Sequence, residues 1–359
     1  DKKNKFDGLI SKLYNLTKNG FELDLTYFSF YTFDRKPNFF SKKFVELIGT
    51  PRKKNEKLNK IHYQIASAMQ RHFEKIVIHL IKVLRFKNNS KNLILGGGAA
   101  MNCVLNGKLD SLNLCNNNHI SYAPDDSGVS VGAALYAHHK FNKSKFNSNE
   151  IKSCYYGPSF DDNEIERTLN RYKIRYEKKT NIEKYASKKI SDGSLIGWFQ
   201  GKMEFGHRAL GNRSILADPR RKNIKNLINK AVKFREDFRP FAPAILQEYQ
   251  HNIMIMPKNR NVYFMERAYK FRKEWVNKIP GVVHTDKTGR VQTVSKKINP
   301  KFYNLIKYFN DITGVPVVLN TSFNLNGEPI VLSPSDAIRT FYSCGLDILI
   351  LGNYVIKKN

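Results

Sequence analysis

The spacing of apolar residues predicts a series of helices and strands in the first half of the chain. Between Ile61 and Leu84 apolar residues recur every three or four positions, which predicts one long helix. Short apolar runs at 92–95 and 119–122 predict strands, and the segment 128–139, rich in small residues, predicts a closely packed helix. Helices and strands in alternation indicate an α/β layer.

Polar residues interrupt this pattern at 141–149, and a second α/β unit is predicted beyond them. Its helices are predicted at 162–172 and 182–191, and its strands at 195–199, 315–320, 330–332 and 346–351. The first 60 residues show no regular period and are predicted to be irregular. We therefore expect one domain over 1–145, a linker with one helix over 146–180, and a second domain over 181–359.

Length and composition are those of a folded protein. The chain has 359 residues, 41% of them hydrophobic, which is enough for a packed core. No apolar stretch approaches the ~20 residues of a membrane span, and no signal peptide is recognisable. The first residue is Asp1 rather than Met, so we expect that something upstream is absent.

The chain is strongly basic, with 61 Lys+Arg against 31 Asp+Glu and a net charge of +30. Nucleic-acid binding, an anionic substrate and a general use of Lys and Asn on solvent faces would each explain this charge. The basic residues are spread out and accompany no nucleic-acid motif, so nucleic acid is the least favoured partner. The scattered cysteines lack a CxxC pair, which predicts reduced thiols in a cytoplasmic protein: Cys103, Cys115, Cys154 and Cys344.

Two short segments follow predicted strands and offer ligand-binding groups. The triplet Gly96-Gly97-Gly98 precedes a predicted helix start at 99–105, and it suits either a nucleotide phosphate or a tight turn. Asp126 follows the strand at 119–122 and precedes a helix. A carboxylate in that place either binds a ligand or caps the helix, and the residues alone favour the cap.

Four polar segments in the second half carry the strongest chemical signal. They span 200–220, 233–243, 284–293 and 319–324, and they combine Arg and Lys with Gly, Ser and Asn. Arg offers forked donors to phosphate oxygens, and Asn and Ser read the edge of a planar amide. A single arginine is more often part of a surface ion pair, but four such segments in one domain predict a pocket for a phosphate or a carbamoyl group.

In this order the four segments resemble the C-terminal half of the O-carbamoyltransferases of the NodU/CmcH family. The resemblance extends to the glycine loop, to the segment around Asp126 and to the helix that bears Gln70 and Glu74. It implies an α/β fold in which part of an actin/sugar-kinase-like (ASKHA) domain precedes a YrdC-like domain with a twisted mixed sheet. The family's N-terminal domain is longer than the part before the linker here, so we expect its N-terminal lobe to be missing.

The resemblance also implies a two-step carbamoyltransferase reaction. The C-terminal domain would form carbamoyl adenylate from carbamoyl phosphate and ATP, and the N-terminal domain would pass the carbamoyl group to a hydroxyl of a small-molecule or glycan acceptor. The residues that would line the carbamoyl phosphate and adenylate pocket are Arg208, Lys233, Arg239, Arg290, Asn320 and Ser322. Gly96, Gly97, Gly98 and Asn102 would contact the nucleotide of the transfer domain, and Asp126 would bind a divalent metal, Fe or Mg, whose other ligands we expect to be absent.

Several residues depart from the family pattern. His62, His72 and His79 do not form the family's metal-binding motif, so we expect them to have packing or surface roles. His207 stands where the family usually has Pro, and Lys287 and Gly289 replace the usual Gly and Ala before Arg290.

Two other functions share the predicted folds. One is a tRNA-modifying enzyme of the threonylcarbamoyl type, which the positive charge slightly favours. The other is a non-enzymatic nucleotide-binding protein, which an exposed apolar patch in place of the missing lobe would support. The sequence determines neither the acceptor nor the oligomeric state.

Overall fold

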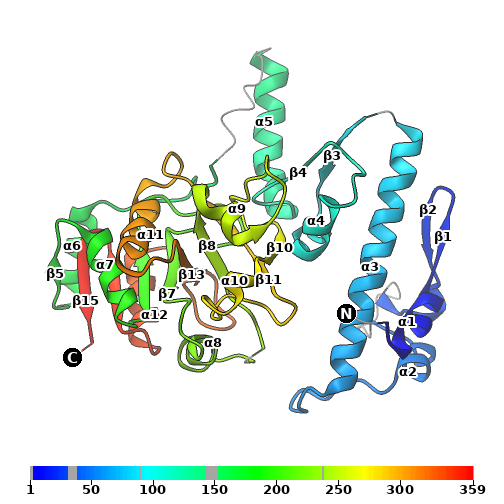
Figure 1. Cartoon of the computed structure of the whole chain (residues 1–359), viewed down its shortest axis with the longest axis horizontal. Coiled ribbons are helices and arrows are strands. Elements are labelled where there is room, and N and C mark those ends of the chain that lie inside the picture. Colours follow the sequence, from blue (N-terminus) through cyan, green and yellow to red (C-terminus); the bar gives the residue numbers. More distant parts are fainter. Residues whose placement is uncertain (1–2, 31–38, 89, 143–152, 237, 359) are drawn as a thin grey trace. The chain divides into compact units, whose positions relative to one another are not determined.

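The computed structural model describes residues 3–30, 39–88, 90–142, 153–236 and 238–358. The chain forms two compact units (Figure 1). One comprises Asp1–Leu93 with Asn113–Asn117, and the other comprises Ile94–Leu112 with Asn118–Asn359.

The first unit is built around one long helix. Helix α3 (Lys60–Lys87) confirms the helix predicted from the apolar period. Before it lie α1 (Lys5–Ile10), α2 (Lys42–Ile48) and the antiparallel hairpin β1 (Tyr14–Thr17) with β2 (Gly20–Leu23). The prediction that the first 60 residues are irregular is therefore wrong, because elements of four to seven residues are too short to show a period.

Two histidines of α3 bond to the hairpin. The hydroxyl of Tyr14 lies 2.7 Å from Nδ1 of His72, and Nε2 of His79 lies 2.8 Å from the carbonyl oxygen of Thr17. These contacts are the packing role that the sequence predicts for both side chains.

The second unit contains an eight-stranded mixed sheet with the order β12-β8-β13-β7-β6-β14-β15-β5. The β12–β8 and β14–β6 pairs are parallel, and the other pairs are antiparallel. This confirms the α/β class with a mixed sheet. The strands are β5 (Glu177–Lys178), β6 (Ile196–Phe199), β7 (Arg213–Ala217), β8 (Ala242–Leu246), β12 (Gln292–Val294), β13 (Val317–Ser322), β14 (Ile348–Leu351) and β15 (Tyr354–Lys357).

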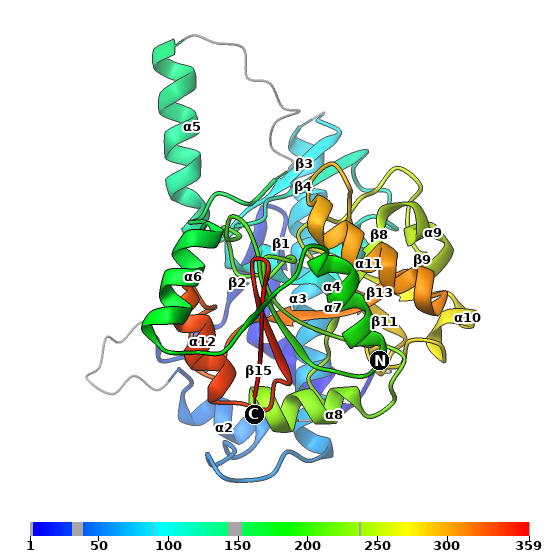
Figure 2. The same cartoon turned by 90° about the vertical axis from the view of Figure 1, so that its left-hand side faces the viewer.

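Four amphipathic helices bury apolar side chains in the core of this sheet. They are α6 (Asp162–Arg171), α7 (Ile182–Ser191), α11 (Pro300–Thr313) and α12 (Pro334–Tyr342). Helices α7 and α11 pack against each other, and α12 packs against β14 and α6 (Figure 2). Three short helices complete the unit: α8 (Ile224–Ile228), α9 (Gln250–Ile253) and α10 (Lys273–Val276).

Smaller elements lie outside the large sheet. Strands β9 (Met254–Ile255), β10 (Ala268–Phe271) and β11 (Thr288–Arg290) form an antiparallel sheet. Strands β3 (Asn92–Leu95) and β4 (Asn117–Ile120) form a two-stranded sheet. Helix α4 (Cys103–Leu109) follows the glycine triplet, and α5 (Val129–Asn142) follows Asp126.

Two predictions for the second half need correction or refinement. The strand predicted at 330–332 is wrong: the amide of Val331 donates to the carbonyl of Phe323, but no strand of the described chain pairs with this segment. Residues 146–152 of the predicted linker 146–180 lie outside the described residues, and its described part packs more closely than a linker would. Its helix α6 buries Ile165 and Leu169 in the core, and β5 joins the large sheet. The domain ranges 1–145, 146–180 and 181–359 stay a prediction.

Within the residues that the structure describes, no helix combines the length and the apolar character that are needed to cross a membrane.

Candidate active site

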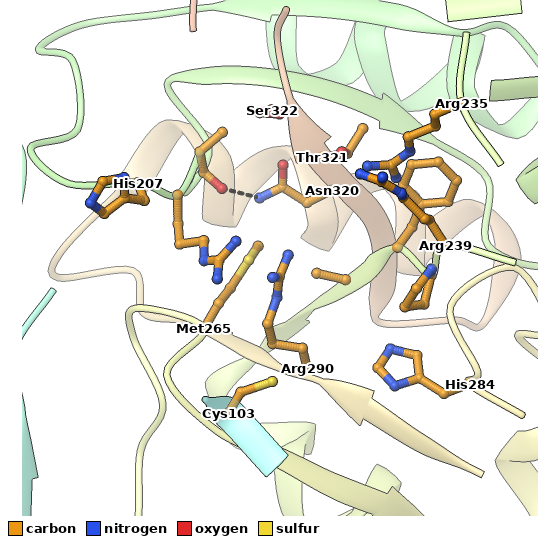
Figure 3. Close-up of a pocket in the computed structure, with 15 residues that line it drawn as sticks. Cys103, His207, Arg235, Arg239, Met265, His284, Arg290, Asn320, Thr321 and Ser322 are labelled. Carbon is orange, nitrogen blue, oxygen red and sulfur yellow. Dashed lines mark hydrogen bonds between the residues drawn. The ribbon is translucent and has the colours of Figure 1, made fainter. Parts of the chain in front are cut away.

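A cavity of about 280 Å³ lies within the second unit (Figure 3). Its walls come from α4, the loop before β7, the segment before β8, and strands β11 and β13. Five of the predicted pocket residues line it: Arg208, Arg239, Arg290, Asn320 and Ser322. The four polar segments of the second half, which lie far apart in the sequence, therefore meet in one place.

The loop that carries Arg208 is held by a buried carboxylate. Oε1 of Glu204 accepts hydrogen bonds from the amides of Leu210 (2.6 Å), Asn212 (2.8 Å) and Arg213 (3.3 Å). Burial raises the pKa of Glu204. Because these amides lie in the turn into β7, Glu204 fixes the backbone that presents Arg208 to the cavity.

Arg208 and Arg290 carry positive charge that the surrounding protein does not neutralise. In the described ranges of the chain, neither guanidinium forms an ion pair, and Nε of Arg290 is buried without a hydrogen-bond partner. Burial lowers the pKa of Arg208, and burial together with the charge of Arg208 lowers the pKa of Arg290 to about 10. Two partly buried cations that repel each other are unfavourable, so this part of the cavity favours an anion.

A second pair of arginines lies in the segment before β8. Nε of Arg235 donates to Oδ1 of Asn229 at 2.8 Å, and its guanidinium lies 5.0 Å from the centre of the Phe241 ring. Arg239 pairs with Glu236 at 2.8 Å, and both side chains are half exposed. This pair is therefore partly neutralised, in contrast to Arg208 and Arg290.

Asn320 offers a hydrogen-bond acceptor inside the sheet. Its side chain is fully buried on β13, and Nδ2 donates to the carbonyl of Ala209 (3.2 Å, Figure 3) and to Oε1 of Gln292 (2.8 Å). These two bonds orient the amide and leave Oδ1 without a partner among the described residues. A buried oxygen of this kind can accept a hydrogen bond from a ligand N–H.

Lys233 does not line the cavity, although the sequence predicts that it does. It ends a turn of π-helix over Asn229–Lys233, which the left-handed Phe234 terminates. Its ammonium donates to the carbonyl (2.5 Å) and Oγ (3.2 Å) of Ser322 and to Oδ1 (2.7 Å) and the carbonyl (3.0 Å) of Asn324, at the end of strand β13. Lys233 therefore holds the end of β13 in the structure.

Burial lowers the pKa of Lys233 to about 7. In the unfolded chain this lysine keeps its proton up to about pH 10.5. Between pH 7 and pH 10.5 the unfolded state therefore binds more protons than the folded state, and the free energy of unfolding rises with pH. We expect the free energy of unfolding to increase by about 2 kcal/mol more from pH 7 to 9 in the unmodified protein than in Lys233→Met. Urea titrations at both pH values measure this; an equal increase in both proteins would show that the surrounding oxygens keep the ammonium charged.

Among the cavity residues that the sequence does not predict, three carry titratable side chains. Cys103 begins α4, and burial raises the pKa of its thiol. His284 lies 3.1 Å from Oγ1 of Thr288, and burial lowers the pKa of this imidazole to about 4, so it is neutral at pH 7. Arg235 is the third. Arg235 and His284 lie inside the polar segments that the sequence singles out, whereas nothing in the sequence links Cys103 to this cavity.

His207 also lines the cavity, and it contacts the segment after β4. Its Nε2 lies 2.5 Å from Oδ2 of Asp125. Hydrogen bonds from Ser127 and from His207 lower the pKa of Asp125. The histidine that replaces the expected proline thus connects the loop before Arg208 to the segment that precedes α5.

The turn before Arg290 contains Lys287 and Gly289, which stand where the family usually has Gly and Ala. Lys287 has a left-handed backbone (φ 64°), and a Cβ on Gly289 would lie 2.6 Å from the ring of Phe271. We expect Gly289→Ala to lower the free energy of unfolding by about 2 kcal/mol and Lys287→Gly to raise it by about 1 kcal/mol. Thermal denaturation of both variants measures this, and a stable Gly289→Ala protein would contradict the packing argument.

The glycine loop lies outside this cavity. The amide of Gly97 donates to the carbonyl of Pro124 at 2.6 Å, and a 3-10 turn over Gly98–Met101 follows. Asn102 caps α4, since its Oδ1 accepts from the amide of Leu105 at 3.1 Å. Gly96, Gly97, Gly98 and Asn102 thus form a strand-to-helix turn, and their role toward a nucleotide stays a prediction.

Asp126 begins a short 3-10 turn that has no side-chain cap, so its interpretation as a helix cap is wrong. A metal ion would need further ligands. Over the residues with a described position, no group of three or more His, Cys, Asp or Glu side chains is arranged to hold one. Because we expect the other ligands to lie outside this chain, the role of Asp126 toward a metal stays a prediction.

Comparison with known proteins places this site in a family. The family models "Carbamoyltransferase N-terminus" and "Carbamoyltransferase C-terminus" match residues 2–135 and 187–358. Nodulation protein NolNO of Sinorhizobium fredii is 40% identical over 311 residues, which are 86% of this chain and 46% of that protein. Nodulation protein U of Rhizobium tropici is 31% identical over 241 residues, 66% of this chain and 39% of that protein.

The chain spans about half the length of the curated relatives it matches. Among solved structures, full-length HypF in its phosphate- and nucleotide-bound form covers 51% of this chain and 23% of its own, with a TM-score of 0.35 and 13% identity. A structural likeness of that size supports no conclusion. The two family models and the relatives show that the chain belongs to the carbamoyltransferase family, to which its sequence motifs are similar throughout.

Proposed function

We propose that the cavity of the second unit forms carbamoyl adenylate from carbamoyl phosphate and ATP. The observation that carries this proposal is the pair of partly buried guanidinium groups, Arg208 and Arg290, which line the cavity and have no carboxylate partner among the described residues. Carbamoyl phosphate, ATP and the adenylate are all phosphate-bearing anions, and each would supply the missing negative charge. The free Oδ1 of Asn320 suits the carbamoyl N–H₂ group.

In the proposed reaction, water cleaves carbamoyl phosphate to carbamate and phosphate. A carbamate oxygen then attacks the α-phosphorus of ATP, the bond to the β-phosphate oxygen breaks, and pyrophosphate leaves with its electron pair. Negative charge grows on the phosphorus oxygens in this step, and Arg208 and Arg290 stabilise it without rearranging. The enclosed cavity also protects carbamate, which decomposes in water.

In the proposed reaction, the second pair of arginines binds the pyrophosphate that leaves. Arg235 and Arg239 lie in the segment before β8, and Asn229 and Glu236 hold their side chains. A pyrophosphate leaving group would displace the half-exposed Glu236 from Arg239, because a more highly charged anion competes for the same guanidinium. Lys233 contributes as a positioning residue, through the end of β13 that carries Ser322.

For the whole protein we propose transfer of the carbamoyl group to a hydroxyl of a small-molecule or glycan acceptor, with AMP as the leaving group. Membership of the carbamoyltransferase family and the likeness to nodulation proteins support this second step. No residue of this chain is assigned to the acceptor, and Gly96, Gly97, Gly98 and Asn102 stay the predicted nucleotide contacts of the transfer step.

Exchange of labelled pyrophosphate into ATP tests the adenylation step directly, because only a reversible adenylate makes the exchange depend on carbamoyl phosphate. We expect exchange in the presence of carbamoyl phosphate and none in its absence. Absence of exchange in folded protein with both substrates would refute the proposal. Exchange that requires threonine and bicarbonate instead of carbamoyl phosphate would favour the threonylcarbamoyl alternative.

A further inference from the structure

His284 belongs to the cavity wall but has no part in the reaction proposed above. It lies in the turn before β11, and Figure 3 shows its imidazole among the side chains that line the cavity. The amide of His284 donates to the carbonyl of Thr288 at 2.8 Å, and the amide of Lys287 donates to the carbonyl of His284 at 2.9 Å. These two backbone bonds close the turn and fix the position from which the imidazole reaches the cavity.

The hydrogen bonds of Thr288 determine which nitrogen of His284 carries the hydrogen. The hydroxyl of Thr288 donates to Oδ1 of Asp286 at 2.7 Å, and the same oxygen accepts from the amide of Thr288 at 3.0 Å. Because the hydroxyl hydrogen is directed to Asp286, Oγ1 of Thr288 accepts from Nδ1 of the imidazole, which lies 3.1 Å away. In the neutral ring Nδ1 therefore carries the hydrogen, and Nε2 keeps its lone pair.

Nε2 of His284 is a proton acceptor without a partner among the described residues. Over the described ranges no Asp or Glu side chain lines the cavity, and arginines stay protonated at neutral pH. Burial raises the pKa of the Cys103 thiol, which therefore keeps its hydrogen. His207, the other histidine of the wall, is 46% exposed and bonds to Asp125, so water competes for its ring. His284 is therefore the best placed base in the cavity.

Positive charge around His284 prepares it for an anionic substrate. Burial, with the charges of Arg290 and Lys225, lowers the pKa of His284 to about 4, against the opposite effect of Asp286. A phosphate bound by Arg208 and Arg290 brings negative charge into the cavity, which favours the protonated imidazole and raises this pKa. A base is most effective when its pKa is close to the working pH. The imidazole therefore accepts a proton more readily with the substrate bound than in the free protein.

We propose that His284 is the general base for the cleavage of carbamoyl phosphate, an assignment that rests on the function proposed for this cavity. Nε2 takes a proton from the water molecule whose oxygen attacks the carbamoyl carbon. The bond between that carbon and the bridging phosphate oxygen then breaks. The phosphate leaves with the electron pair and takes the proton from the imidazolium. The products are hydrogen phosphate and carbamic acid, which ionises to carbamate, and the neutral imidazole is restored.

Two sources of carbamate separate this role from substrate binding. Carbamoyl phosphate needs the cleavage step, whereas ammonium carbamate supplies carbamate directly. We expect His284→Gln to slow phosphate release from carbamoyl phosphate, measured above the spontaneous rate, by about 100-fold or more, because glutamine takes up no proton. Pyrophosphate exchange should fall at least tenfold with carbamoyl phosphate and change less than threefold with ammonium carbamate. Exchange with ammonium carbamate also shows that the variant folds.

Further variants test the geometry around the base. His251→Gln is the matched control, because His251 lies on α9 outside the cavity, and it should change phosphate release by less than twofold. Thr288→Val removes the hydroxyl that orients the imidazole and should slow phosphate release about tenfold, and Thr288→Ser, which keeps a hydroxyl, should restore it. Free imidazole added to His284→Ala should recover phosphate release, since it supplies the missing base.

Three results would overturn the proposal. One is an equal loss of exchange with both carbamate sources in His284→Gln, because His284 would then act in binding or folding. The others are unchanged phosphate release in His284→Gln and a larger loss in His207→Gln. Failure of the adenylation proposal gives a different result, in which the unmodified protein releases phosphate from carbamoyl phosphate but shows no exchange with either source. If the unmodified protein releases no phosphate above the spontaneous rate, the assignment of His284 fails as well.

Discussion

Replacing Arg290 with methionine is expected to reduce pyrophosphate exchange by at least 100-fold and at the same time to stabilise the protein by about 1 kcal/mol. The loss of activity follows if the guanidinium stabilises charge on the reacting phosphate. The gain in stability follows because Arg290 is a partly buried cation whose charge is repelled by Arg208, and its buried Nε has no hydrogen-bond partner among the described residues. Methionine has a similar length and no charge, so it removes the repulsion and keeps the packing.

Arg175→Met is the matched control. Arg175 is exposed and lies just before the edge strand β5, so its replacement should change neither exchange nor stability. Urea denaturation and the exchange assay measure both properties on the same preparations. A structural role for Arg290 would produce the opposite result for stability, since its removal would then lower the free energy of unfolding. Opposite signs for activity and stability are typical of residues kept for function.

Replacing Gly107 with alanine is expected to destabilise the second unit by about 3 kcal/mol or more and to reduce exchange as well. Gly107 lies on α4, where an added Cβ would be 2.0 Å from the carbonyl oxygen of Ala268 on β10. The obstacle is backbone, so α4 or β10 has to move. Ala268 lies opposite Arg290 in the β10–β11 pair, and a shift of β10 therefore displaces an arginine of the cavity.

Gly132→Ala on α5 is the control for this variant, because an added Cβ there has open space within 4 Å. Alanine is also the better helix former, so the control should leave stability unchanged or raise it slightly. Thermal denaturation and the exchange assay again provide the measurements. If Gly107→Ala unfolds like the unmodified protein, the close approach of α4 to β10 does not exist in solution.

The sequence predicts α3, α6 and α7, where an apolar period is visible, but α11 and α12 are not predicted although they are similarly long and regular. The polar segments of the pocket were also found, since Arg, Gly and Asn stand out against an apolar background. Lys233 shows the limit of this reasoning: its place in a conspicuous basic segment predicts a substrate contact, whereas in the structure its ammonium bonds to Ser322 and Asn324 at the end of β13. A basic residue in such a segment can equally well serve to hold the backbone.

Contacts between distant residues were not predictable in this way. Asp110 at the end of α4 pairs with Arg260 at 2.9 Å and with Arg267 at 3.3 Å, about 150 residues further along. Each partner is an ordinary charged residue in its own neighbourhood. Only the folded chain reveals that this ion cluster and the contact at Gly107 hold α4 against β10, and thereby bring Cys103 to the cavity wall.

That ion cluster has a practical consequence for dividing the protein. An expression unit limited to 181–359 would retain Arg267, which is 2% exposed and also pairs with Glu266, and would discard Asp110, its carboxylate partner from the earlier part of the chain. The truncated product would keep Arg267 buried with only one of its two carboxylate partners. Its cavity would lack the wall that Cys103 forms in the full chain. It would therefore be a poor substitute for the 359-residue chain in inhibitor screening or crystallisation. Boundaries for such work belong upstream of Ile94, where the second compact unit begins.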